Sequence, residues 1–157
     1  MIRSSSSRRF ATFTNVPCRS DNLLRRFDQR RPRRSAIYQQ IIELLKQHGT
    51  VLTEHFGQSS LTSAGENLAD RAIHDRDLAW LRKADVLVAE VTTPSLGVGY
   101  EIGRAVEWGK PVICLYRQSP ERRLSGMIAG CAGITVHRYD DVRDLPAILR
   151  LSLTSDP

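Results

Sequence analysis

The stretch ADVLVAEVTTPSLGVGYEIGRA, residues 84–105, predicts a buried strand, a Ser/Gly loop and a helix in direct succession. The mostly apolar run at 85–91 is short and bounded by turn residues, which is typical of a strand covered on both faces. Gly97 and Gly99 would let the backbone approach a ligand closely. The start of the next helix would offer free N–H groups and a positive dipole end, which suit a phosphate.

Glu101 follows this loop, and the pattern places it in the first turn of a helix from 99 to 108. A carboxylate and a phosphate pocket at the carboxyl end of a parallel strand indicate chemistry on a sugar phosphate. A glutamate at this position is also favourable through the helix dipole alone, so the position by itself leaves a structural role open.

Strands and helices alternate outward from this stretch. Helical spacing, caps and breakers predict helices over 35–49, 66–83, 119–130 and 142–151, and apolar runs predict strands over 50–55, 111–116 and 134–139. This alternation predicts an α/β fold, a doubly wound parallel sheet with helices on both faces. A chain of 157 residues forms one domain. We expect it to span 35–152, before a short tail at 153–157.

Residues 1–34 differ in composition from the rest. They hold ten arginines and two aspartates, a net charge of +8, so a total of +6 leaves −2 for the other 123 residues. The positive charge therefore belongs to this leader and not to the domain, which argues against a nucleic-acid-binding domain, although a polyanion-binding tail stays open. Residues 1–14 are rich in Arg and Ser without acids, as in a mitochondrial presequence or an irregular leader.

Composition excludes other classes of protein. No run of 18 apolar residues is present, so we expect no membrane span. The three cysteines, at 18, 114 and 131, show no CxxC spacing and fit a reducing compartment, and Cys114 reads as a small buried hydrophobe. The four histidines lack zinc-ligand spacing, so no metal is expected.

Asp77 is the second candidate for chemistry. The spacing of Ala69, Ile73, Trp80 and Ala84 predicts one apolar stripe on the helix, and Asp77 falls within it. An inward carboxylate costs desolvation energy and should have a raised pKa, as a general acid needs. A structural aspartate that caps a loop or pairs with an arginine is the alternative.

Together, Glu101 and Asp77 form the kind of pair that cleaves a glycosidic bond, one carboxylate as nucleophile and one as acid. A Ser-His-Asp triad is not supported, because Ser95 lies in Pro-Ser-Leu-Gly and not in G-x-S-x-G. Three further positions have two readings each. Glu90 contacts ligand or caps a loop, His55 lines a pocket or is structural, and the segment 122–125 (RRLS) meets a phosphate or is a solvated turn.

Four segments carry a specific resemblance: TVLTEH at 50–55, IHDRDLAWL at 73–81, the stretch 84–105 and LSGMI at 124–128. Over about 35–139 the chain resembles the 2′-deoxynucleoside 5′-phosphate N-hydrolases of the nucleoside 2-deoxyribosyltransferase superfamily. The resemblance implies a flavodoxin-like fold, a homodimer, no cofactor, and hydrolysis of a deoxynucleoside monophosphate to free base and 2-deoxyribose 5-phosphate. We expect a cytoplasmic or nuclear enzyme, or a mitochondrial one if the leader is a transit peptide.

The resemblance also implies roles for particular residues. Glu101 matches the family's nucleophile, Asp77 its general acid and Ser95 a phosphate contact. Ser125, Gly126 and Met127 match a segment that the partner subunit contributes to the phosphate site. The family's first strand and its Gly-Ser-Ile-Arg-Gly-Gly loop have no match in residues 1–34, so we expect the first strand to be either 10–16 or missing.

Other functions remain open at this point. A nucleoside deoxyribosyltransferase would pass the sugar to a second base, and a phosphoribohydrolase would accept a 2′-hydroxyl. A nucleotide-binding module without catalysis would bind deoxynucleotides and not turn them over.

Overall fold

The computed structural model describes residues 22–26, 32–52 and 68–153. Its elements are β1 (Asn22–Arg26), α1 (Pro32–Lys46), β2 (Thr50–Val51), α2 (Asp70–Lys83), β3 (Val86–Glu90), α3 (Leu96–Glu107), β4 (Val112–Arg117), α4 (Gly126–Ala129), β5 (Thr135–Tyr139), the 3-10 helix η2 (Val142–Asp144) and α5 (Leu145–Leu153). The strands form one parallel sheet in the order β2-β1-β3-β4-β5. The predicted α/β fold with a doubly wound parallel sheet is confirmed.

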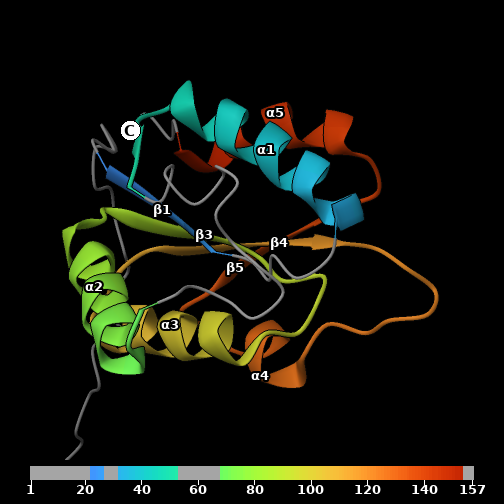
Figure 1. Cartoon of the computed structure of the whole chain (residues 1–157). Coiled ribbons are helices and arrows are strands. Elements are labelled where there is room, and N and C mark those ends of the chain that lie inside the picture. Colours follow the sequence, from blue (N-terminus) through green and yellow to red (C-terminus); the bar gives the residue numbers. More distant parts are fainter. Residues whose placement is uncertain (1–21, 27–31, 53–67, 154–157) are drawn as a thin grey trace, which may run out of the picture.

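Helices cover both faces of this sheet. Figure 1 shows α1 and α5 on one side and α2, α3 and α4 on the other. Every residue of β3 is buried, and successive side chains alternate between the two layers: Val86 and Val88 pack with α1 and α5, Leu87 and Ala89 with α2 and α3. A strand covered on both faces explains why its sequence is continuously apolar.

The first strand lies within residues 1–34, where we expected no family-type strand. β1 pairs on one edge with β2 and on the other with β3, with Leu23 opposite both Val51 and Val86. Ladder hydrogen bonds on both edges stabilise a segment whose two arginines made it a weak strand in sequence. The alternative strand at 10–16 lies outside the described residues.

Helix boundaries differ from the prediction at several places. α1 begins at Pro32 and not at Ser35, and α2 begins at Asp70 and not near 66. The helix expected over 119–130 is wrong for its first half, because Ser119 Oγ accepts the Glu121 N–H in a turn and only Gly126–Ala129 is helical. The Tyr116 hydroxyl donates to the Arg122 carbonyl at 2.6 Å and holds the intervening chain in its non-helical path.

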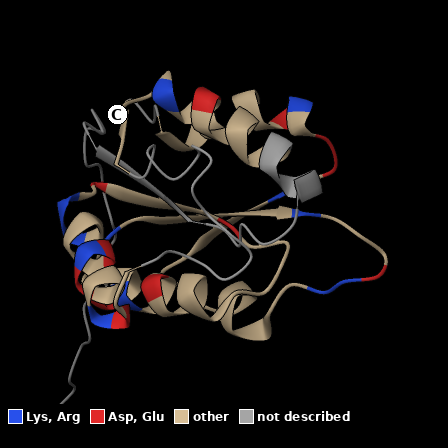
Figure 2. Cartoon of the chain, viewed as in Figure 1, with Lys and Arg blue, Asp and Glu red and all other residues tan. Residues whose placement is uncertain are grey.

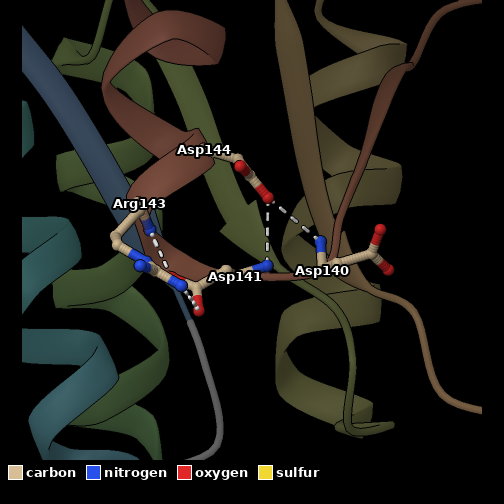
Figure 3. A network of polar contacts seen from close by, with 4 residues as sticks. All are labelled: Asp140, Asp141, Arg143 and Asp144. Carbon is tan, nitrogen blue, oxygen red and sulfur yellow. Dashed lines mark hydrogen bonds and ion pairs between the residues drawn. The ribbon is translucent and has the colours of Figure 1, made fainter.

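The last helix is entered through a capping network (Figure 3). Asp141 accepts the Arg143 N–H at 2.9 Å, and Asp144 accepts the Asp141 N–H at 3.0 Å. This reciprocal pair is a capping box that precedes α5. The predicted helix over 142–151 is therefore split into η2 and α5, and α5 continues to Leu153.

Candidate active site at the carboxyl ends of β3 and β4

The loop from Val91 to Ser95 joins β3 to α3, and hydrogen bonds tie it to β4 and to the segment after β4. The Val91 N–H donates to the Leu115 carbonyl of β4 at 2.9 Å. Thr92 Oγ1 accepts the Arg117 N–H at 2.8 Å, and Thr93 Oγ1 accepts from Arg122 Nη1 at 3.1 Å. The loop is thus fixed to the neighbouring strand and to the segment that follows it.

Helix α3 begins at Leu96, three residues earlier than predicted, so Gly97 is helical and not a loop residue, and Gly99 lies inside the helix and not at its start. Ser95 is the N-cap, and the first helical hydrogen bond runs from the Gly99 N–H to the Ser95 carbonyl at 3.0 Å. Apart from the adjoining residues and the backbone of α3 itself, no protein atom in the described part of the chain lies within 4 Å of where a Cβ on either glycine would be. The surface of α3 at these two glycines is therefore uncovered, and the binding of an anionic group at the start of the helix stays a prediction.

Glu101 is one turn deeper than the sequence indicated, in the second turn of α3, because the helix starts earlier. Only 6% of its surface is exposed, and its Oε2 oxygen is inaccessible to solvent. The neighbouring Val98, Ile102 and Ala105 pack in the same layer as α2. Burial, rather than the first-turn dipole effect that we expected, is thus the main feature of the environment of Glu101.

Asp77 lies on α2 with 13% of its side chain exposed. Its Oδ1 accepts from Arg76 Nε at 3.0 Å and lies 3.0 Å from Arg76 Nη2, and the Arg76 guanidinium stacks over Trp80 at 4.8 Å. The predicted stripe is wrong in part, since α2 buries Leu78 and Leu81 while Ala69 is exposed. The arginine partner that was the structural alternative for Asp77 is present.

The two carboxylates stand on adjoining helices. Leu78 and Leu81 of α2 pack in one cluster with Val98 and Ile102 of α3. A polar contact also joins the two helices, since His74 Nε2 lies 3.2 Å from the Tyr100 hydroxyl. His74 is one turn before Asp77 on α2, and Tyr100 immediately precedes Glu101 on α3. Figure 2 shows charges of both signs along α2, whereas most of α3 is uncharged.

The segment from Ser125 to Met127 lies at the exposed start of α4. Ser125 is the N-cap of this helix, and its side chain makes no capping hydrogen bond. Met127 is 84% exposed and Leu96, at the start of α3, is 96% exposed. His55, the remaining candidate, lies outside the described residues.

A small pocket lies beside Glu90, the residue for which the sequence left open a ligand contact or a loop cap. It is lined by Ile37, Tyr38, Glu90, Thr92, Thr93, Arg117 and Tyr139, which come from α1 and from the carboxyl ends of β3, β4 and β5. Glu90 Oε1 accepts the Thr92 N–H at 3.3 Å and the Tyr139 O–H at 3.4 Å. The sequence feature that pointed to this place is a glutamate at the end of an otherwise apolar strand.

The described residues give no sign of a metal site or of a reactive thiol. These contain no group of three His, Cys, Asp or Glu side chains that could hold a metal ion, and none of their helices is long and apolar enough to cross a membrane. Burial raises the pKa of the Cys114 thiol to about 12, as expected for a cysteine that serves as a core residue and not as a nucleophile.

Comparison with known proteins gives a consistent set of similarities. A family model described as nucleoside 2-deoxyribosyltransferase matches residues 27–144. A mouse protein named 5-hydroxymethyl-dUMP N-hydrolase is 58% identical over 99 residues, which cover 62% of this chain and 57% of the mouse protein. A human protein of the same name is 54% identical over 126 residues, which cover 77% of this chain and 72% of the human protein.

A Trichoplax adhaerens protein named putative 2′-deoxynucleoside 5′-phosphate N-hydrolase 1 is 59% identical over 93 residues, covering 59% of this chain and 63% of its own length. The chain thus spans between about half and three quarters of these relatives. Among solved structures, Clostridium botulinum CMP N-glycosidase superposes with a TM-score of 0.61 at 17% identity, covering 83% of this chain and 98% of its own. At this identity the superposition shows the shared fold.

Proposed function

Because the chain belongs to the nucleoside 2-deoxyribosyltransferase family, we propose that it hydrolyses the N-glycosidic bond of 2′-deoxynucleoside 5′-monophosphates. The products are the free base and 2-deoxyribose 5-phosphate. The relatives named as N-hydrolases of such nucleotides support this reaction class. The observation that carries the proposal in this chain is the buried Glu101, one turn inside a helix whose first turn is open.

In this mechanism the 5′-phosphate binds at Ser95 and the exposed N–H groups of the first turn of α3. The Glu101 carboxylate attacks the anomeric carbon, the bond to the base nitrogen breaks, and a covalent deoxyribosyl ester forms. Water then attacks the same carbon, releases Glu101 and gives the sugar phosphate. A 2-deoxy sugar assists because its oxocarbenium-like transition state lacks an electron-withdrawing hydroxyl.

Asp77 is assigned as the group that donates a proton to the leaving base and later accepts one from the attacking water. Its Oδ1 oxygen is paired with the Arg76 guanidinium at 3.0 Å. We propose that the bound base takes the place of this guanidinium beside Asp77.

A homodimer completes the proposed site. Ser125, Gly126 and Met127 of one subunit would reach the phosphate in the site of the other. The exposure of Met127 and of Leu96 supports a covered surface here, because large apolar side chains gain free energy when they are removed from water.

The test is a panel of deoxynucleotides, ribonucleotides and unphosphorylated nucleosides, followed by chromatography of the released base. 5-Hydroxymethyl-dUMP comes first because the mouse and human relatives are named for it. Release from deoxynucleoside monophosphates alone supports the proposal. Release that requires an added acceptor base would instead identify a deoxyribosyltransferase, the activity in the description of the matching family model.

A further inference from the structure

Glu90 is a buried carboxylate to which the proposed mechanism gives no role. Only 6% of its surface is exposed. Burial raises the pKa of Glu90, while hydrogen bonds from Thr92 and Tyr139 and the charge of Arg117 act in the opposite direction. A polar group that is this buried destabilises the fold unless its contacts compensate, so those contacts indicate what it does.

The contacts of Glu90 converge on the loop that carries Ser95. Its Oε1 oxygen accepts the Thr92 N–H from the loop and the hydroxyl of Tyr139 from β5. Thr92 is held from a second side by β4, because its Oγ1 accepts the Arg117 N–H. The first polar residue of the loop is therefore bonded directly to the ends of β3 and β4, and through Glu90 it is linked to the end of β5.

Glu90 reaches the loop from the face of the sheet opposite α3. Val88, two residues earlier and on the same side of the strand, packs with α1 and α5, whereas Ala89 packs with α3. Ile37 and Tyr38 of α1 line the pocket next to Glu90. Any effect of Glu90 on a ligand at the start of α3 must pass through the loop.

We propose that Glu90 is a positioning residue, whose Oε1 oxygen holds the Thr92 amide and thereby places Ser95 and the first turn of α3 where they bind the 5′-phosphate. This inference rests on the proposed substrate class. It assigns Glu90 to ground-state binding of the phosphate and not to the chemical step.

Two substitutions distinguish the effect of the hydrogen-bond acceptor of Glu90 from the effect of the size of its side chain. Glu90→Gln keeps a side-chain oxygen that can accept the Thr92 N–H. Glu90→Met has a similar length without an acceptor, and the adjacent pocket gives it room. Val88→Ala, on the same face of β3, is the matched control for lost stability without a change in the loop contact.

The measurements are the Kd for a deoxynucleoside monophosphate by calorimetry, KM and kcat for base release, and Tm. Glu90→Met should raise Kd and KM about tenfold, or about 1.4 kcal/mol, and change kcat less than about twofold. This split is what loss of uniform binding produces. Glu90→Gln should restore most of the affinity, and Val88→Ala should lower Tm without raising KM.

Wild-type Kd in Glu90→Met, or equal losses in Glu90→Met and Glu90→Gln, would overturn the inference. A wild-type chain that binds deoxynucleotides but releases no base would contradict the proposed function alone, and the Kd comparison would still decide the role of Glu90. A wild-type chain that binds no deoxynucleotide would contradict both.

Discussion

Arg122 Nη1 donates a hydrogen bond to Thr93 Oγ1 at 3.1 Å and thereby joins the β3–α3 loop to the segment after β4 in the same chain. Thr93 precedes Ser95 in the β3–α3 loop, and Arg122 precedes Ser125 in the segment after β4. The Tyr116 hydroxyl donates a hydrogen bond to the backbone carbonyl of Arg122, so the backbone that carries this guanidinium is itself held in place.

Arg122→Ala should raise KM for a deoxynucleoside monophosphate about threefold to tenfold, because one hydrogen bond to a charged donor is lost at an exposed position. Arg123→Ala is the matched control, since Arg123 is the adjacent exposed arginine. Steady-state kinetics of both variants decide the point. Equal KM values for the two would show that the Thr93 contact does not matter for binding.

Asp77→Asn should slow base release by about 10²-fold or more, and the loss should be largest for bases that leave poorly without protonation. An amide cannot donate a proton as a carboxylic acid does. The rates are compared across a series of deoxynucleotides, with Tm recorded for each variant. A uniform loss for all bases that follows the loss of Tm would support the structural ion pair with Arg76 as the main role.

Glu90→Gln should gain stability relative to the wild type as the pH rises. Since burial raises the pKa of Glu90 above its ordinary value of 4.5, the folded state favours the protonated form. The contribution of Glu90 to the free energy of unfolding is therefore fully present below pH 4.5 and is lost as the pH rises through its folded-state pKa. Urea unfolding of both proteins between pH 4 and 8 measures this difference, and a constant difference over that range would contradict the prediction.

Ser125 should act in the site of the partner subunit. Glu101→Ala and Ser125→Ala homodimers should each be impaired, and mixing them should restore activity, because a heterodimer contains one site with both wild-type residues. Native mass spectrometry of the mixture confirms subunit exchange. Mixed dimers that form and remain inactive would place Ser125 outside the shared site.

Much of the architecture was predictable because the periodicity of buried residues is strong. β3 and β4 are apolar up to their last residues, Glu90 and Arg117, and the sequence placed both strands within one or two residues of their observed bounds. β1 was not predicted, since its pairing with β2 and β3 is a long-range effect that local propensity does not contain. The start of α3 was also misplaced, because the glycines at 97 and 99 favour a loop locally whereas the packing of Val98 favours a helix.

The candidate site was predictable in its residue types and less so in its environments. Glu101 lies in the second turn of α3 and is buried, and its position could not be predicted because the predicted start of the helix was wrong. Arg76, the partner of Asp77, is the residue immediately before it in the sequence. Helical spacing predicts contacts between residues three or four positions apart and not between adjacent ones, so this pair was not expected. The link from Glu90 to Tyr139 joins residues 49 positions apart and needed the strand order.

Base release by Glu101→Gln tests the central claim most directly, because glutamine keeps the shape of the buried side chain and removes the nucleophile. With Tm and deoxynucleotide Kd close to those of the wild type, the variant should lose at least about a thousandfold in kcat. It should form no covalent deoxyribosyl adduct by mass spectrometry of the quenched reaction. Turnover within about tenfold of the wild type by a folded variant that binds substrate would contradict the assignment of Glu101 as the nucleophile.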